Sequence, residues 1–318
     1  MRNVFGKSII ISTVMMMSSL PAYAQQDILI GGGSVTGVYY QVALQTCKLL
    51  NTHQSKDYHC IGRPALGSVF NINAVIRGLL DFGIAQSDIN YEASKGEGPW
   101  ADAPATKLRS VFSLYPETVL LMARVDAKIK TVTDLKGKIV NIGNEGSGQR
   151  LNAQEILKLY GLDETTDIKS KGLQQSEASR ALVAGKIDAF FYTVGNPSAA
   201  LEEPAAAIHT DLISINSQAI KSLVTEKPYY VMTTIPADTY KGISHVTETY
   251  AVKATVVASS DLSDQAVYDY VKTVFENLEE LKGLHQAFKI LNSNAMLQGL
   301  TAPLHDGAIK YYKERGLM

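Results

Sequence analysis

Short apolar runs alternate with longer amphipathic stretches along the first third of the chain. Apolar runs at 27–30 and 58–61 each precede a helical pattern, over 38–51 and 69–77 respectively. A third run, 80–88 with the sequence LDFGIAQSD, ends in polar residues and leads into another helix. This order of strand, helix, strand, helix and strand predicts a parallel sheet, whose ligands bind beyond the carboxyl ends of its strands.

The middle of the chain repeats this order. A stretch rich in β-formers covers 110–125, and we expect Pro116 to interrupt it. A strand at 138–142 is followed by a glycine loop and a helix over 147–160. A further helix, 177–184, leads into an apolar strand that ends on the residues GNP. The middle therefore predicts a second α/β unit.

The last third supplies the remaining elements. Strands are expected near Leu212 and Tyr229 and over 252–258, and helices over 264–282 and 306–315. Together the patterns predict two α/β lobes with glycine-rich junctions between strand and helix at the mouth of each sheet. A cleft between lobes is a usual place for a small ligand.

The first 24 residues have a different pattern. Arg2 and Lys7 give a positive start, 8–20 is mostly apolar, and PAYA ends in an A-x-A cleavage site at Ala24. These three regions are typical of a secretory signal peptide, the alternative being a buried N-terminal helix. We expect cleavage after Ala24 and export to the periplasm, and no cysteine follows the apolar region to carry a lipid anchor.

The order of elements also predicts how the mature chain divides. We expect 25–112 to form the first part of lobe I and 113–230 to form lobe II. Residues 231–318 then return to lobe I and add the C-terminal helices. The segments that cross between the lobes would form a hinge.

Charge and composition exclude several classes of protein. The chain has 318 residues and a net charge of −1, which becomes −3 when Arg2 and Lys7 leave with the signal peptide. No basic run is present, so a nucleic-acid partner is not expected. No other apolar stretch approaches the roughly 20 residues that cross a bilayer, so a permanent membrane anchor is not expected. The six histidines are scattered and neither H-E-x-x-H nor C-x-x-C occurs, so no metal site is predicted.

The two cysteines, Cys47 and Cys60, both follow the cleavage site. In an oxidising compartment a single pair is expected to form a disulfide. A loop of this length would stabilise the fold by about 3 kcal/mol in the chain-entropy model. Sequence alone does not show whether their Cα atoms lie close enough.

The glycine loops do not fit the nucleotide-binding motifs. GNEGSGQR has Gln149 and Arg150 where a phosphate loop needs Lys and Ser or Thr. GGGSVTG has Thr36 in place of the third glycine of the dinucleotide motif. We therefore expect no nucleotide cofactor. The simplest alternative is that these glycines only form tight turns, but five such loops follow predicted strands and would converge at one cleft.

Nucleophilic catalysis has little support either. No clean G-x-S-x-G motif occurs, and an exported α/β hydrolase would have to use Ser68 or Ser147. The nearest histidine, His59, has no visible acidic partner to orient it. The sequence therefore predicts a binding protein and not an enzyme.

Four motifs behind a signal peptide carry a family resemblance: GGGSVTGVYY, GSVFNINAVIRGLLDFGIAQSD, DLKGKIVNIGNEGSGQR and GKIDAFFYTVGNPS. In this order they resemble the TAXI family, the solute receptors of one class of tripartite ATP-independent periplasmic (TRAP) transporters. The resemblance covers essentially the whole mature chain. It implies a two-lobed type II periplasmic binding protein, with mostly parallel sheets and a hinge between the lobes.

The resemblance also implies a function. Members bind small organic anions, such as glutamate or a dicarboxylate like 2-oxoglutarate, and deliver them to the TRAP membrane permease subunits without enzymatic activity or a cofactor. The alternatives are the binding subunit of an ABC-type importer, which shares the fold, the exported hydrolase, and a surface protein with no transport role.

A carboxylate is well held by the free N–H groups and positive dipole at a helix N-terminus. Three of the glycine loops offer such ends, and matches to the family motifs add further positions. The residues predicted to bind the ligand are Ser34, Val35, Thr36, Tyr39, Tyr40, Gly67, Ser68, Gln86, Asp88, Glu117, Gly146, Ser147, Gly148, Arg150, Gly195 and Asn196.

Several of these positions have alternative roles. Tyr40 could pack in the core, and Asp88 could cap the next helix while Gln86 contacts the ligand. Glu117 could pair with an amino group of the ligand or be an exposed acid on a hinge strand. Arg150 could pair with a distal carboxylate or be a solvated helix residue.

One loop departs from the family pattern. Many relatives carry Ser-Thr-Gly-Gly-Ser before the second helix, where this chain has RPALGS. Pro64, Ala65 and Leu66 remove a hydroxyl group and add apolar bulk, and Arg63 adds a charge at the sheet mouth. We therefore expect an organic anion as the ligand without restricting it to glutamate.

Overall fold

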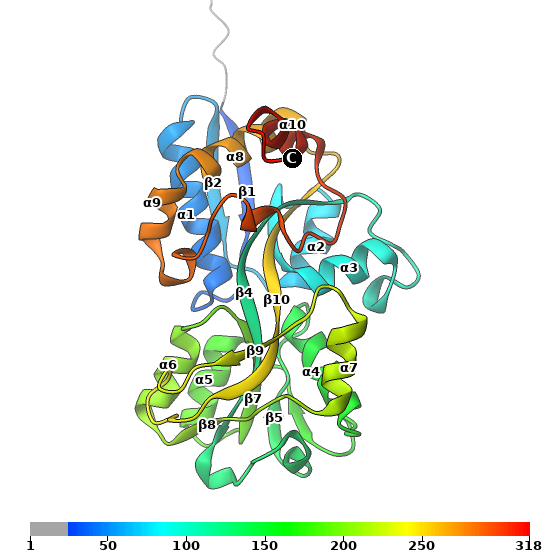
Figure 1. The fold of residues 1–318 in the computed structure, drawn as a ribbon, viewed down its shortest axis with the longest axis vertical. Helices are drawn as coiled ribbons and strands as arrows, with labels where there is room; N and C mark the ends of the chain where they lie inside the picture. Colours follow the sequence, from blue (N-terminus) through cyan, green and yellow to red (C-terminus); the bar gives the residue numbers. More distant parts are fainter. Residues whose placement is uncertain (1–24) are drawn as a thin grey trace, which may run out of the picture.

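Two long strands, β4 (Leu108–Arg124) and β10 (Thr247–Ser259), run along the long axis of the molecule and join two α/β lobes (Figure 1). The computed structural model describes residues 25–318, so the predicted signal peptide lies outside the described residues. β4 and β10 pair antiparallel at the centre of a sheet with the order β2-β1-β3-β10-β4-β7-β5-β6. The predicted fold class, a two-lobed α/β protein, is confirmed.

The first lobe combines the N-terminal elements with the C-terminal helices, the upper half of Figure 1. Its strands β2, β1 and β3 are parallel, and Ile30 of β1 lies opposite both Gly62 and Phe82. The elements are β1 (Gln26–Gly31), α1 (Val38–His53), β2 (Tyr58–Arg63), α2 (Ser68–Ile76), β3 (Phe82–Gln86), α3 (Ser87–Lys95), α8 (Asp264–Glu276), α9 (Leu278–Leu284) and α10 (Asp306–Glu314), with 3-10 turns at Gly98–Trp100, Gln286–Phe288 and Ala295–Leu297.

The second lobe repeats the parallel arrangement with β7, β5 and β6. Two short strands extend it, because β8 pairs with β4 and β9 pairs with β10. The elements are β5 (Ile139–Asn141), α4 (Gly148–Leu159), β6 (Lys169–Lys171), α5 (Gln175–Val183), β7 (Ala189–Val194), α6 (Ala199–Ala207), β8 (Thr210–Leu212), α7 (Gln218–Glu226) and β9 (Val231–Ile235), with 3-10 turns at Val125–Ala127 and Val132–Leu135.

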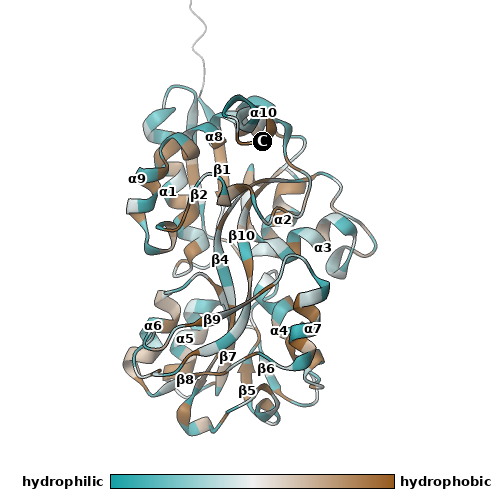
Figure 2. Ribbon diagram, viewed as in Figure 1, coloured by the Kyte–Doolittle hydropathy of each residue, from teal (hydrophilic) through white to brown (hydrophobic). Residues whose placement is uncertain are grey.

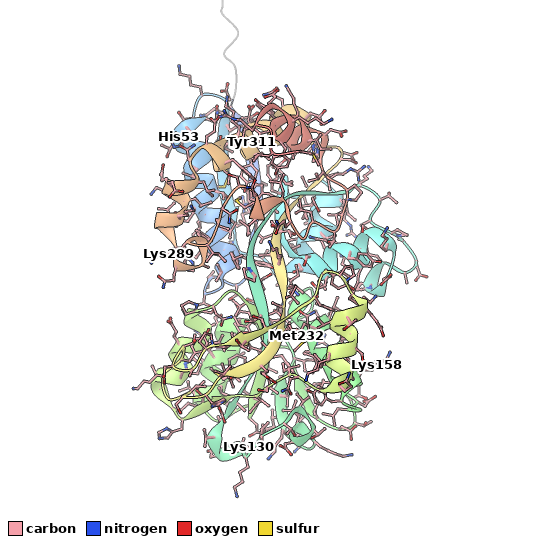
Figure 3. All side chains as sticks on the ribbon, in the orientation of Figure 1. His53, Lys130, Lys158, Met232, Lys289 and Tyr311 are labelled. Carbon is pink, nitrogen blue, oxygen red and sulfur yellow. A yellow bond between two sulfur atoms is a disulfide. The ribbon has the colours of Figure 1, made fainter. Side chains whose placement is uncertain are left out.

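Apolar side chains gather between the sheet and the helices that cover it. In the first lobe Tyr270 of α8 packs on Phe82 and Phe112, with ring centroids 4.3 and 5.8 Å apart. In the second lobe Val140 of β5 and Ile156 of α4 are fully buried. Figure 2 shows β1 and β5 as apolar and α3 as mostly polar. The labelled charged side chains in Figure 3, Lys130 and Lys158 among them, project outward.

Several local predictions differ from the structure, among them β10, which begins at Thr247 and so five residues before the expected strand. β4 continues through Pro116, because β7 pairs with β4 only from Thr118 onward and the β10 register is irregular beside Pro116, so the ladder tolerates a missing N–H. The helix expected over 264–282 divides at Asn277 into α8 and α9. The strand expected near Tyr229 begins two residues later, as β9.

The predicted disulfide is confirmed. It joins Cys47 in α1 to Cys60 in β2, and the two Cα atoms are 5.0 Å apart. Both cysteines are buried in the first lobe, so the bond ties the first helix to the edge strand of the sheet.

The described residues were also compared with what a membrane span and a metal site require. None of the helices between residues 25 and 318 combines the length and apolarity that crossing a bilayer requires. Over the same residues no group of His, Cys, Asp and Glu side chains is arranged to hold a metal ion.

Candidate functional site

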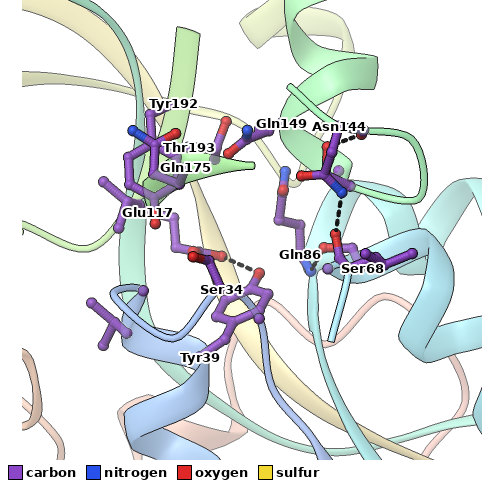
Figure 4. A pocket seen from close by; sticks show the side chains of 18 residues that line it. Ser34, Tyr39, Ser68, Gln86, Glu117, Asn144, Gln149, Gln175, Tyr192 and Thr193 are labelled. Atoms are coloured by element: carbon purple, nitrogen blue, oxygen red, sulfur yellow. Dashed lines mark hydrogen bonds between the residues drawn. The ribbon is translucent and has the colours of Figure 1, made fainter. Parts of the chain in front are cut away.

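A cavity of about 60 Å³ lies between the two lobes, beside the central strand β4 (Figure 4). Loops and helix starts of the first lobe line one side, and the start of α4, the start of α5 and the end of β7 line the other. The lining residues are Gly33, Ser34, Gly37, Val38, Tyr39, Leu66, Gly67, Ser68, Gln86, Glu117, Asn144, Ser147, Gly148, Gln149, Gln175, Tyr192, Thr193 and Val194.

Among the helices that start at the cavity wall, α1 and α2 from the first lobe and α4 from the second have a glycine or serine as N-cap. Their N-caps are Gly37, Gly67 and Ser147, and none of the three helices has an acidic residue in its first turn. Neither glycine offers a capping side chain. The first N–H groups of a helix have no intrahelical partner, so these ends supply donors and positive dipoles to the cavity.

A buried asparagine holds the first glycine loop in place. The Nδ2 atom of Asn71, on α2, donates to the carbonyls of Gly31, Gly32 and Ile84 at 3.2, 2.7 and 2.8 Å. A Cβ atom at Gly32 would lie only 2.8 Å from the Cα atom of Tyr40, so the loop can approach α1 only with glycine there. The GGGS sequence and Asn71 together position the start of α1.

The two lobes touch at the mouth of the cavity. The backbone N–H of Phe70 donates to the carbonyl of Gly146 at 3.0 Å, and the Asn144 side chain donates to the carbonyl of Leu66, also at 3.0 Å. Gly67 has φ +112°, and a Cβ atom there would lie 3.1 Å from the Cα atom of Ser147. The lobes are therefore closed over the cavity, and the RPALGS loop forms one lip of it.

Glu117 is the single carboxyl group among the lining residues, and it is 2% exposed. Its Oε2 atom accepts a hydrogen bond of 2.6 Å from the hydroxyl of Tyr39. Burial raises the pKa of Glu117 well above its usual value, although the Tyr39 hydrogen bond opposes this. The same burial, together with the charge of Glu117, raises the pKa of Tyr39. The alternative that Glu117 is an exposed acid does not hold.

Two glutamine side chains of the second lobe reach the cavity wall without hydrogen-bond partners in the described structure. Gln149 is 6% exposed and its Nε2 atom is unpartnered, and Gln175 is 2% exposed with both amide atoms unpartnered. An unpartnered buried amide costs about 1–3 kcal/mol. These amides are therefore available to a ligand.

The electrostatic character of the wall follows from its composition. Of the described residues that line the cavity, none is Lys, Arg or His. Negative charge can therefore be balanced here only by N–H groups, hydroxyl groups and amides. Positive charge on a ligand can be balanced by Glu117.

Half of the predicted ligand-binding residues meet at this cavity. They are Ser34, Tyr39, Gly67, Ser68, Gln86, Glu117, Ser147 and Gly148. Ser68 is the first residue of α2 and not its N-cap, and its hydroxyl accepts from the backbone N–H of Gln86 at 3.1 Å.

The other half lies outside the cavity lining, and their ligand contacts stay predictions. Val35 is 54% exposed. Arg150 bonds to the carbonyl of Gly143 at 3.1 Å and lies 4.0 Å from Glu164. The Asn196 amide bonds to Thr118 and Tyr240. The remaining members of this half are Thr36, Tyr40, Asp88, Gly146 and Gly195.

Several lining residues were missed from the sequence. In the sequence, Gln149 stands out only as a mismatch to the phosphate-loop motif. Gln175 is the first residue of α5, which the pattern predicts to begin two residues later. Tyr192 and Thr193 are polar residues near the carboxyl end of an apolar strand. That position, where ligands of parallel sheets bind, is the signal that would have found them.

The fold is that of two-lobed periplasmic binding proteins. Residues 30–316 match the model of the NMT1-like family, and the chain belongs to that family.

Three solved structures with this fold share little sequence with the chain. The malate-bound MatC protein of Rhodopseudomonas palustris is 13% identical over 82% of this chain and 88% of its own, with a TM-score of 0.55. The alkanesulfonate-binding protein SsuA of Xanthomonas axonopodis pv. citri, bound to MOPS, is 17% identical over 83% and 79%, with a TM-score of 0.50. A binding protein component of an ABC phosphonate transporter from Pseudomonas aeruginosa is 12% identical over 83% and 79%, with a TM-score of 0.51. At these identities the likeness concerns the fold alone.

Proposed function

We propose that this chain is a periplasmic solute receptor of the TAXI type. It captures a small organic anion between its lobes and delivers it to the membrane subunits of a TRAP transporter. The observation that carries this proposal is the interlobe cavity, where three helix N-termini and the unpartnered amides of Gln149 and Gln175 face one small space. Such a wall suits a carboxylate, and none of the serine hydroxyls in the described lining is hydrogen-bonded to a histidine or carboxylate that could activate it.

Among organic anions, Glu117 favours an amino acid over a plain dicarboxylate. A carboxylate of the ligand would bind at the helix ends, and its ammonium group would lie against Glu117. The ammonium would replace the proton that burial favours on Glu117, so a charged pair would form inside the closed cavity. A dicarboxylate such as 2-oxoglutarate would instead require Glu117 to stay protonated.

The variant Glu117→Gln separates these two ligand classes. We expect it to weaken binding of L-glutamate or L-glutamine by tenfold or more, and to leave 2-oxoglutarate within about threefold of wild type. Isothermal titration of residues 25–318, unfolded and refolded to remove bound solute, measures both. A variant that binds all of these compounds as tightly as wild type would remove Glu117 from ligand recognition.

The family motifs support TRAP over ABC transport, which uses the same fold. Right-side-out membrane vesicles from the native cells distinguish the two. With a TRAP partner, an imposed ion gradient drives uptake of the bound solute once the purified receptor is added, without ATP. Uptake that needs ATP inside the vesicles and ignores the gradient would favour the ABC alternative.

A further inference from the structure

Behind the cavity wall, a buried chain of polar side chains crosses from one lobe to the other. Gln86, at the end of β3, lines the cavity on the side of the first lobe. Its Nε2 atom donates to the Oδ1 atom of Asn152, on α4 of the second lobe, at 2.7 Å. The Nδ2 atom of Asn152 donates back across the interface to the Oδ2 atom of Asp88, on α3, at 2.6 Å.

The carboxylate at the end of this chain fixes the direction of every hydrogen bond in it. Burial raises the pKa of Asp88, and the hydrogen bonds that it accepts from Asn152, Ile89 and Gln86 oppose this shift and favour the ionised form. An ionised carboxylate only accepts, so Asn152 turns its NH₂ group toward Asp88 and its oxygen toward Gln86. The hydroxyl of Thr193 donates to the same Asn152 oxygen at 2.8 Å. The NH₂ group of Gln86 donates to Asn152 at 2.7 Å and, more weakly, to Asp88 at 3.3 Å, which leaves its Oε1 atom as the end available to the cavity.

These polar side chains are almost completely buried, so each depends on the others for its hydrogen bonds. Asp88 is 0%, Asn152 2% and Gln86 3% exposed. Besides Asn152, Asp88 accepts from the backbone N–H of Ile89 at 2.9 Å and from the Nε2 atom of Gln86 at 3.3 Å. It also lies 3.3 Å from the hydroxyl of Tyr230, in the second lobe, which donates to Glu155 of its own lobe at 2.9 Å. Opening the lobes would break the contacts with Asn152 and Tyr230.

We propose that Asn152 is a positioning residue that latches the lobes together and fixes the orientation of the Gln86 amide toward the ligand. This inference rests on the proposed function for its ligand, but the latch itself consists only of the protein's own side chains. An asparagine suits this position because its amide donates to Asp88 and at the same time accepts from Gln86 and Thr193. A leucine of similar size does neither.

The first test needs no ligand. Hydrogen exchange of the Phe70 backbone N–H reports closure, because that N–H is bonded to Gly146 of the other lobe, away from Asn152. We expect Asn152→Leu to speed this exchange by tenfold or more at an unfolding temperature close to that of wild type. Gln154→Leu is the matched control, since Gln154 lies on the same helix and its amide bonds only to Glu164 of its own lobe, at 3.1 Å.

Tyr230→Phe is a second variant that keeps the ring against Tyr229 and Tyr250 and loses only the hydroxyl. We expect a smaller acceleration, about threefold, because the Asn152 bonds remain. If Asn152→Leu does not fold, Tyr230→Phe decides whether contacts with Asp88 hold the lobes together. Exchange at Phe70 that is unchanged in the folded variants, or equally fast in Gln154→Leu, would overturn the latch.

The second test adds L-glutamate and 2-oxoglutarate as probes. For whichever compound wild type binds, Asn152→Leu should raise the dissociation constant by about tenfold or more, the loss expected for a hydrogen bond to a charged group. Gln154→Leu should leave it within twofold. If wild type binds neither compound, the proposed ligand class fails while the exchange experiment still decides the latch.

Discussion

The two lobes meet the cavity with different chemistry. The first lobe presents the glycine N-caps of α1 and α2, which offer no capping side chain, beside the side chains of Tyr39, Ser68 and Gln86. The second lobe presents the start of α4, where the hydroxyl of the N-cap Ser147 accepts a hydrogen bond from the backbone N–H of Arg150 at 3.3 Å. It adds the unpartnered amides of Gln149 and Gln175. The glycine helix starts of the first lobe suit any small anion, and the unpartnered amides of the second lobe suit a particular arrangement of polar groups. Affinity would thus come mainly from the helix starts and selectivity from side chains, among which Gln149 and Gln175 of the second lobe have unpartnered amide atoms.

The largest expected effect comes from filling the space between the walls. Ser147→Trp places a large ring in a cavity of about 60 Å³ and should weaken ligand binding by at least about 100-fold, measured by titration calorimetry. Losing the cap should also cost about 1 kcal/mol of unfolding free energy.

Ser217→Trp is its control, because Ser217 caps α7 in the same way and does not line the cavity. We expect a similar loss of stability with unchanged binding. Equal affinity in the two variants would remove the α4 loop from the site.

A medium effect, on the pH dependence of stability, is expected at Glu92. Acidic side chains of both lobes lie close together there, outside the cavity. Burial, and then the charges of Asp88, Glu155 and Glu97, raise the pKa of Glu92 to about 8, while Lys227 opposes the shift. A raised pKa means that the folded chain holds this proton more tightly than the unfolded chain does. The resulting stability is complete below pH 4.5 and is lost as pH rises through about 8.

Glu92→Gln should therefore raise the unfolding free energy at pH 9, by on the order of 2 kcal/mol, and leave it unchanged at pH 4. Urea unfolding at the two pH values measures this. Glu279, on α9, is exposed and forms an ion pair with Lys282. The control Glu279→Gln should show no difference between the two pH values in its effect on the unfolding free energy. A Glu92 variant that is stabilised equally at both pH values would contradict the electrostatic explanation.

The smallest expected effect tests the amides of the second lobe. Gln175→Leu should weaken ligand binding by about tenfold and at the same time raise the unfolding temperature, because it removes an unpartnered buried amide. Gln218 holds the same first position in α7 and is exposed, so Gln218→Leu should change neither quantity. A loss of binding and stability together would mean that Gln175 acts only in folding.

Much of the fold could be predicted because its signals are local. Glycines after apolar runs marked the starts of α1, α2 and α4, and the periodic helices that follow them lie within two residues of their predicted ends. Helices α6 and α7 were not predicted. Pro204 lies inside α6, and proline is a poor signal for a helix interior.

The part of the site that could be predicted is the set of residues around helix starts and strand ends, in both lobes. Glycine and serine at strand ends pointed to helix starts, and half of the proposed residues meet at the cavity. The role of Asn152 could not be predicted, because it lies mid-helix and acquires partners only when α4 of one lobe packs on Asp88 and Gln86 of the other. Contacts between lobes leave no periodic signal in either segment.

The most direct test of the central claim is thermal unfolding of residues 25–318, stripped of solute, against acidic and neutral compounds. The panel holds L-glutamate, L-glutamine, 2-oxoglutarate, other dicarboxylates, neutral amino acids and sugars. A ligand at 100 times its dissociation constant stabilises a protein by about 2.7 kcal/mol. We predict that at least one small carboxylate raises the unfolding temperature of wild type and not of Ser147→Trp. Stabilisation by none of the carboxylates, or equal stabilisation of both proteins, would contradict a carboxylate receptor that binds between its lobes.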